Sequence, residues 1–312
     1  MNRLLSFALL CGLLLLAGCS GKEKETEWGV YNEPVESSEL PQSAGVDELN
    51  TKWTRSIGNT GEDGYALIRP AVADDAVYIA SRKGDLARLD PVNGRVVWRH
   101  AIGRAVYAAV GLGEGLVLAA MDDGAVVALD ADTGEPQWES NIKRQISAIP
   151  GAGSGRVVVR TADGLVAGLD SADGEQVWSV QRNVPGLSLH GDSTPMIAGD
   201  TVITGLANGR IMANAVVNGR EFWESDLSIV GGGNELEQLT DIDSEPVLQG
   251  SGLYTATYQG DVVAVDIQSS SVRWRQSVST RLPLSVDGDA VFVTASLGEV
   301  IAIDSENGDI LW

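Results

Sequence analysis

Seven of the eight tryptophans recur at a nearly regular spacing, and this spacing restricts the fold more than any other feature. They are Trp53, Trp98, Trp138, Trp178, Trp223, Trp274 and Trp312. The successive steps are 45, 40, 40, 45, 51 and 38 residues. Periods of about 20–50 residues are typical of repeat architectures. The spacing therefore predicts an array of similar units rather than the two ordinary domains that a length of 312 residues would also allow.

Glycine and aspartate keep the same register as the last six of these tryptophans. A glycine stands 14 positions before each of them: Gly84, Gly124, Gly164, Gly209, Gly260 and Gly298. An aspartate stands eight positions before five of them, with Ala215 as the exception. A glycine stands four positions before five of them, with Ser270 as the exception. Six copies in register indicate true repeats.

Each repeat has the pattern of four short strands. In the second repeat we expect strands at 107–110, 116–121, 125–130 and 135–140, separated by glycine-containing turns. Glycine at a hairpin tip supplies the positive φ that tight turns need. Four antiparallel strands in about 40 residues, repeated six times, predict an all-β fold, a β-propeller with four-stranded blades.

The repeat itself resembles a known one. The segment from Asp130 through Gly134 to Trp138 is similar to the PQQ-like, or tryptophan-docking, propeller repeat. The resemblance implies that each repeat tryptophan lies on the outermost strand of a blade and packs against the neighbouring blade. Residues 51–55 carry a repeat tryptophan with no strands before it. We therefore expect 51–312 to be a C-terminally truncated propeller, with six blades of eight and about 75–80 residues missing.

The N-terminus has the pattern of a lipoprotein signal. Arg3 precedes an apolar run over 4–16, which is short for a membrane-spanning helix. The run ends in Leu16-Ala17-Gly18-Cys19, which resembles a lipobox. That resemblance implies removal of 1–18 and lipidation of Cys19. The polar composition of the next segment predicts a flexible tether over 19–50. An ordinary secretory signal is the alternative. Ser20 in place of aspartate points to the inner leaflet of the outer membrane, facing the periplasm.

Charge and cysteine content exclude several functions. The formal net charge is -21, which opposes binding to nucleic-acid phosphates and to anionic head groups. Both cysteines lie in the first 19 residues, so the rest of the chain has no disulfide, cysteine nucleophile or cysteine metal site. No metalloprotease, P-loop or nucleophile-elbow motif is present, and we predict no catalytic residue, metal or cofactor. Calcium at aspartate-rich turns such as 130–134 remains an alternative.

Two insertions lengthen the steps after Trp178 and Trp223. The first includes Leu187 and Leu189, and the second includes Asp241 and Asp243. Both fall between the outer strand of one repeat and the inner strand of the next, so they open on the same face of adjacent blades. Apolar anchors beside charges are typical of protein-binding surfaces. Ordinary long loops whose leucines fold back are the alternative.

These features together resemble the BamB family, the propeller lipoproteins of the β-barrel assembly machine. Leu187-Ser188-Leu189-His190-Gly191 matches the family's Leu-Ser-Leu-Arg-Gly loop, and Asp241-Ile242-Asp243 matches its Asp-x-Asp loop. His190 departs from the family's arginine and is mostly neutral at neutral pH.

The resemblance implies a non-enzymatic scaffold that uses Leu187, Leu189, His190, Asp241 and Asp243 to bind the POTRA region of BamA. Its other implied partners are the remaining subunits of the machine and nascent outer-membrane β-barrel proteins. A PQQ-dependent quinoprotein dehydrogenase and a generic periplasmic binding propeller are the alternatives.

Overall fold

The computed structural model describes residues 50–56, 68–73, 75–185, 193–228, 241–242, 244–257, 260–280, 282–296 and 298–312. The chain divides into two compact units, 1–42 and 43–312, and all described residues belong to the second. The regular secondary structure of these residues is entirely β-strand. Within them we find no helix with the length and hydrophobicity needed to cross a membrane.

The first three sheets have four strands each. The first blade contains β1 (Ala71–Ala73), β2 (Ala76–Ala80), β3 (Asp85–Leu89) and β4 (Val96–Ala101). The second contains β5 (Gly111–Gly113), β6 (Leu116–Ala120), β7 (Ala125–Asp130) and β8 (Pro136–Asn141). The third contains β9 (Gly151–Gly153), β10 (Arg156–Arg160), β11 (Leu165–Asp170) and β12 (Gln176–Gln181).

The next three sheets continue the pattern. The fourth blade contains β13 (Met196–Ala198), β14 (Thr201–Gly205), β15 (Arg210–Ala215) and β16 (Glu221–Asp226). The fifth contains β17 (Val247–Gln249), β18 (Gly252–Ala256), β19 (Val262–Asp266) and β20 (Val272–Gln276). The sixth contains β21 (Ser285–Asp287), β22 (Ala290–Thr294) and β23 (Val300–Asp304).

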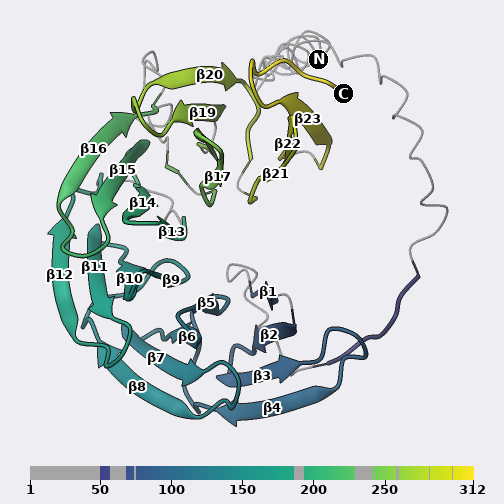
Figure 1. Cartoon of the computed structure of the whole chain (residues 1–312), viewed down its shortest axis with the longest axis vertical. Helices are drawn as coiled ribbons and strands as arrows, with labels where there is room; N and C mark the ends of the chain where they lie inside the picture. Colours follow the sequence, from purple (N-terminus) through teal and green to yellow (C-terminus); the bar gives the residue numbers. More distant parts are fainter. Residues whose placement is uncertain are drawn as a thin grey trace, which may run out of the picture. The chain divides into compact units, whose positions relative to one another are not determined.

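Every sheet is an antiparallel meander in which consecutive strands are neighbours. The blades follow one another around a common centre, with the short first strand of each blade innermost (Figure 1). The core lies between the blades, where Leu118 and Ala128 of the second pack with Val157 and Leu169 of the third. The sequence-based prediction of an all-β propeller is therefore confirmed.

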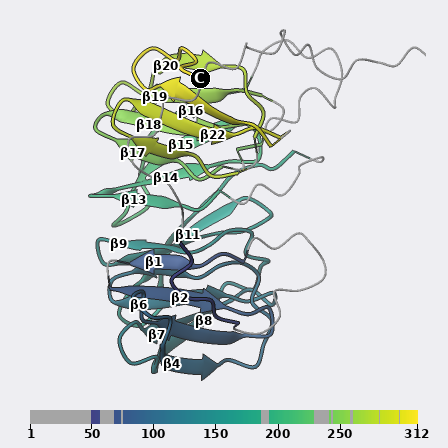
Figure 2. The same ribbon diagram turned by 90° about the vertical axis from the view of Figure 1, so that its right-hand side faces the viewer.

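The antiparallel order divides the turns between two faces, seen edge-on in Figure 2. The connector face carries the links between blades and the turns between second and third strands, such as the turn at Gly124. The hairpin face carries the turns between first and second and between third and fourth strands, such as those at Gly115 and Gly134. Gly115, Gly124 and Gly134 all have positive φ, as expected for hairpin tips.

The repeat tryptophans connect successive blades. The indole N–H of Trp138 donates to the carbonyl of Ser171 in the third blade at 2.8 Å, and its ring lies on Gly174. Equivalent bonds of 2.8–3.0 Å join Trp53 to Pro91, Trp98 to Ala131, Trp178 to Val216 and Trp274 to Ser305. Trp223 packs against the fifth blade but makes no such bond among the described residues.

The first strand of the second repeat lies further along the chain than predicted. We expected it at 107–110, but β5 covers Gly111–Gly113, and Val106 instead forms an isolated bridge with Met121. A Cβ atom on Gly111 would lie 2.1 Å from the carbonyl oxygen of Pro150 in the next blade. Gly111, which we expected in a turn, therefore lies in a strand and allows the innermost strands of two blades to approach each other closely.

The sixth blade differs from the prediction of a complete four-stranded blade. Its sheet has three strands. The segment that follows pairs with β23 through an Ile303–Ile310 bridge, through an Asp304 N–H bond to the Asp309 carbonyl, and through hydrogen bonds of Ala302 with Leu311 and Trp312. The pairing therefore covers only the first part of the fourth strand that the other blades show.

The aspartate eight positions before five of the repeat tryptophans caps the turn between the third and fourth strands. The Asp130 carboxylate accepts the N–H groups of Asp132 and Thr133 at 3.0 and 2.8 Å, and the Thr133 N–H and hydroxyl hold the pKa of Asp130 below its usual range. An ion pair with Arg273, together with the N–H and hydroxyl of Ser269, holds the pKa of Asp266 well below its ordinary value. These two turns are thus built around ionised carboxylates.

Because these pKa values are lower in the folded state, we predict that the stability of the fold depends on pH. A carboxyl whose pKa is lower in the folded state stabilises the fold above its unfolded pKa, near 3.8, and this contribution fades as the pH falls toward the folded pKa. We expect Asp266→Asn to melt below the wild-type protein at neutral pH, and the difference to shrink below about pH 4. Thermal unfolding across this range checks the prediction, and a difference independent of pH would contradict it.

Candidate partner-binding face

Most residues of the predicted partner site lie outside the described part of the chain. Leu187, Leu189, His190 and Asp243 belong to this group, and Cys19, the predicted lipidation site, also lies outside the described part. Asp241 is described, as are the residues that immediately follow the first insertion. The geometry of the site is therefore built from the bases of the two loops.

The bases of the two insertions are joined on the connector face. The hydroxyl of Thr194, which follows the first insertion, donates to Glu245 Oε1 at 2.5 Å. A Cβ atom on Gly205 would lie 2.6 Å from Ile242 and 2.8 Å from the hydroxyl of Ser193, so strand β14 runs tightly beneath both bases. The two loops accordingly start from one packed platform, which we call the loop platform (193–194, 241–242 and 244–245).

An arginine from the first blade reaches the loop platform. Arg69, which precedes β1, forms an ion pair with the same Glu245 oxygen that Thr194 contacts. Their side chains are 38% and 28% exposed, so solvent screens the pair and its contribution to stability is modest, about 1 kcal/mol or less. Its geometric effect is to link residues 176 positions apart in the sequence, at the inner ends of the first and fifth blades.

Asp241 occupies a different environment from the one that we expected. The sequence pattern placed two carboxylates on a displayed loop, whereas Asp241 is only 1% exposed and has a partner. Its neighbour Ile242 is fully buried and bridges to Thr257. Asp241 thus belongs to the base of the second loop. The sequence pattern Asp-Ile-Asp alone does not predict that the Asp241 carboxylate is buried.

Sequence reasoning missed a series of ion pairs on the connector face. Arg104 pairs with Asp123 at 3.2 Å and with Glu139 at 2.8 Å, and Arg144 pairs with Asp163. The available signal was positional, because Arg104 and Arg144 each follow a repeat tryptophan by six residues. These pairs join the links between the first three blades to the turns of the following blades.

Among the described residues, no group of three or more histidine, cysteine, aspartate or glutamate side chains is placed to hold a metal ion. The aspartates of the 130–134 turn and its equivalents bond instead to backbone N–H groups of their own turns.

Comparison with known proteins identifies the family. The model of the family described as outer membrane protein assembly factor BamB matches residues 46–141 and 82–312. The chain belongs to the BamB family. The BamB of Pseudomonas aeruginosa is 44% identical over 98% of this chain and 78% of its own length. The crystal structure of BamB from Moraxella catarrhalis has a TM-score of 0.72 and 28% identity, over 78% of this chain and 74% of that one.

The enzyme-like neighbours share only the fold. A europium-containing methanol dehydrogenase has a TM-score of 0.63 but 13% sequence identity, over 82% of this chain and 72% of that one. This likeness shows a common propeller architecture. It does not transfer a cofactor or an activity, since sites are grafted onto folds independently.

Proposed function

We propose that this protein is a non-enzymatic scaffold of the outer-membrane β-barrel assembly machine. It is anchored through a lipid on Cys19 to the inner leaflet of the outer membrane and faces the periplasm. Its connector face binds the POTRA region of BamA through Leu187, Leu189, His190 and Asp243, and the buried Asp241 holds the second loop in place. The other subunits of the machine and nascent β-barrel proteins complete its partners. The description of its relatives as assembly factors supports this role.

The observation that carries the proposal is the joining of the two loop bases. The Thr194–Glu245 hydrogen bond and the packing of Ser193 and Ile242 on Gly205 bring both insertions to one platform. A partner bound there meets the apolar loop and the acidic loop together. Pre-organisation of this kind lowers the entropy that loops lose on binding. Buried Asp241 acts in this scheme by fixing the second loop.

The decisive experiment changes the apolar loop alone. We expect Leu187→Ala with Leu189→Ala to reduce co-purification with the BamA POTRA region by about tenfold or more, because central apolar anchors dominate binding energy. Val92→Ala is the matched control, since Val92 is 76% exposed and lies on the hairpin face. Equal co-purification of the double variant and the control would overturn the assignment of the site.

A variant of the second loop distinguishes contact from support. Asp241→Asn keeps the size of a side chain that is 1% exposed. We expect it to weaken binding to the POTRA region and to accelerate amide exchange over 241–247, while exchange in the blade strands is unchanged. Weaker binding with unchanged exchange would instead make Asp241 a direct contact.

A further inference from the structure

The fourth blade lacks the aspartate that caps the equivalent turn in every other blade. In the other five, this carboxylate accepts a backbone N–H two or three residues further on, and the distances are 2.8–3.0 Å. The pairs are Asp90 with Val92, Asp130 with Thr133, Asp170 with Ala172, Asp266 with Ser269 and Asp304 with Glu306. Ala215 places a methyl group where those carboxylates begin.

The turn of the fourth blade nevertheless keeps the shape of the others. Gly219 donates to the Ala215 carbonyl and Ala215 donates to the Arg220 carbonyl, both at 2.8 Å, as in the second blade. Gly219 has a φ of +72°, close to the +74° of Gly134. The N–H groups of Val217 and Asn218, however, have no acceptor among the described residues. Two donors thus point at the position of a missing carboxylate.

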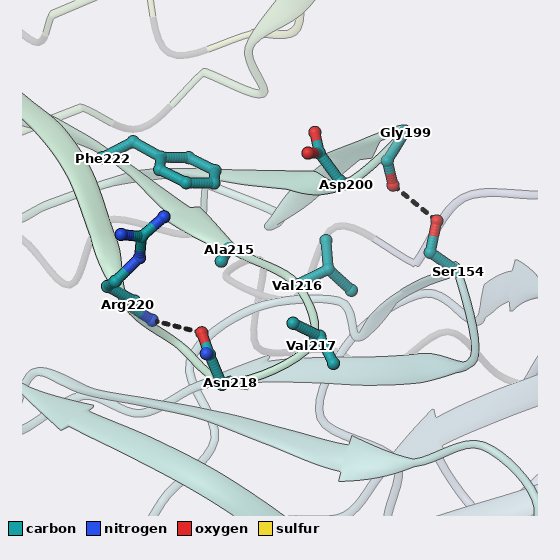
Figure 3. Close-up of a pocket in the computed structure, with 9 residues that line it drawn as sticks. All are labelled: Ser154, Gly199, Asp200, Ala215, Val216, Val217, Asn218, Arg220 and Phe222. Carbon is teal, nitrogen blue, oxygen red and sulfur yellow. Dashed lines mark hydrogen bonds between the residues drawn. The ribbon is translucent and has the colours of Figure 1, made fainter.

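A groove of about 410 Å³ lies at this position on the hairpin face (Figure 3). Besides the turn itself, it is lined by Ser154 from the third blade and by Gly199 and Asp200 from the turn between β13 and β14. The hydroxyl of Ser154 donates to the carbonyl of Gly199 and joins the two blades at the edge of the groove. The groove is large enough for one or two amino-acid residues.

The groove combines a cation with an apolar wall. Val217 and Phe222 line it and are 61% and 42% exposed. The guanidinium carbon of Arg220 lies 5.4 Å from the centre of the Phe222 ring, so a positive charge stands beside the apolar wall that Phe222 forms. Asp200 also lines the groove, and its negative charge disfavours a ligand with more than one carboxylate. The groove therefore suits a single carboxylate next to an apolar group.

We propose that this groove binds the C-terminal residue of an extended peptide whose last side chain is apolar or aromatic. The terminal carboxylate takes the place of the missing aspartate and accepts from Val217 and Asn218, and the last side chain packs on Phe222. A C-terminal residue carries both groups on one Cα atom. An aspartate inside an extended peptide differs, because the side chains of the residues next to it point to the opposite face of the strand. These side chains cannot pack on Phe222 while the aspartate carboxylate reaches the turn. Backbone N–H nests are a recurrent means of capturing terminal carboxylates.

The site is independent of the proposed partner face. The groove lies on the hairpin face and the loop platform on the connector face, so a peptide and a connector-face partner can be bound together. Failure of this inference would leave the proposed binding of BamA untouched, and the reverse also holds.

The test measures binding of short labelled peptides to the full chain by fluorescence anisotropy. A peptide that ends in phenylalanine with a free carboxylate is compared with its C-terminal amide and with an amidated peptide that carries an internal aspartate. We expect the free acid to bind about tenfold or more tightly than either, since only it presents both groups. Absence of binding, or equal binding of acid and amide, overturns the proposal. Equal binding of the internal aspartate peptide also overturns it, in favour of an acidic-peptide site.

The sharpest variant is Ala215→Asp, because it restores the carboxylate that the other five blades have. We expect it to cap the turn, to keep or raise the thermal midpoint and to weaken binding of the free-acid peptide about tenfold or more. Asp200→Asn is the matched control, since it changes one charge in the same groove in the opposite direction and should not weaken binding. Unchanged affinity in Ala215→Asp would refute the assigned carboxylate position.

Discussion

Replacing Trp138 with alanine is expected to lower the free energy of unfolding by about 3–5 kcal/mol. The Trp138 ring is buried between the second and third blades, where it lies on Gly174 and its N–H donates to Ser171. Removing it leaves a cavity between two blades and an unsatisfied carbonyl. Because neighbouring blades contact each other on both sides, the vacant space cannot close without moving a whole blade. Denaturant unfolding of the variant and the wild-type protein measures the loss.

Phenylalanine at the same position separates the hydrogen bond from the packing. Trp138→Phe retains most of the apolar area and loses the 2.8 Å bond to Ser171, which predicts a cost of about 1–2 kcal/mol. Trp223→Phe is the matched control, since the Trp223 indole makes no equivalent bond among the described residues. We expect the Trp223 variant to be the milder of the two. Equal losses would mean that the indole N–H contributes nothing to blade docking.

The sequence predicted the repeated parts of the fold because repetition averages out local ambiguity. The hairpin tips were predictable, since a glycine such as Gly124 or Gly134 recurs at the same place in several copies and has positive φ. The predicted position of β5 was wrong because Gly111 is needed for close contact with the next blade. The pattern within one repeat contains no information about a carbonyl of the neighbouring blade. Six copies in register fix the architecture, whereas the inner strands depend on distances between blades.

The candidate site was predictable only as a position on the ring. The two long steps after Trp178 and Trp223 located both insertions on one face. The contacts that organise their bases were not predictable, because Arg69 and Glu245 are 176 residues apart and meet only when the ring forms. For Ala215 the reverse holds. Its departure from the repeat is visible in the sequence, but only the structure shows that free N–H groups and a groove lie beside it.

The same blade junction can be disrupted from its other side by adding a methyl group. Gly174→Ala places a Cβ atom 2.5 Å from Trp138 Cε3, at a residue whose φ is +74°. The unfavourable backbone costs about 1–2 kcal/mol and the overlap with the indole about 1–3 kcal/mol, so we expect a total loss of about 2–5 kcal/mol. Gly155→Ala is the matched control in the same blade, because Gly155 has a φ of +73° and nothing lies within 4 Å of the added atom. It should show the backbone cost alone.

The double variant decides whether overlap with the indole is the cause. In the Trp138→Ala background the added methyl group meets the space that the indole leaves, so Gly174→Ala should cost no more than Gly155→Ala does. The difference between the two backgrounds is a coupling energy of about 1–3 kcal/mol, as measured for residues in direct contact. Strictly additive losses would show that Gly174 is required for its backbone conformation only, and that the tryptophan could dock on any residue able to adopt that turn.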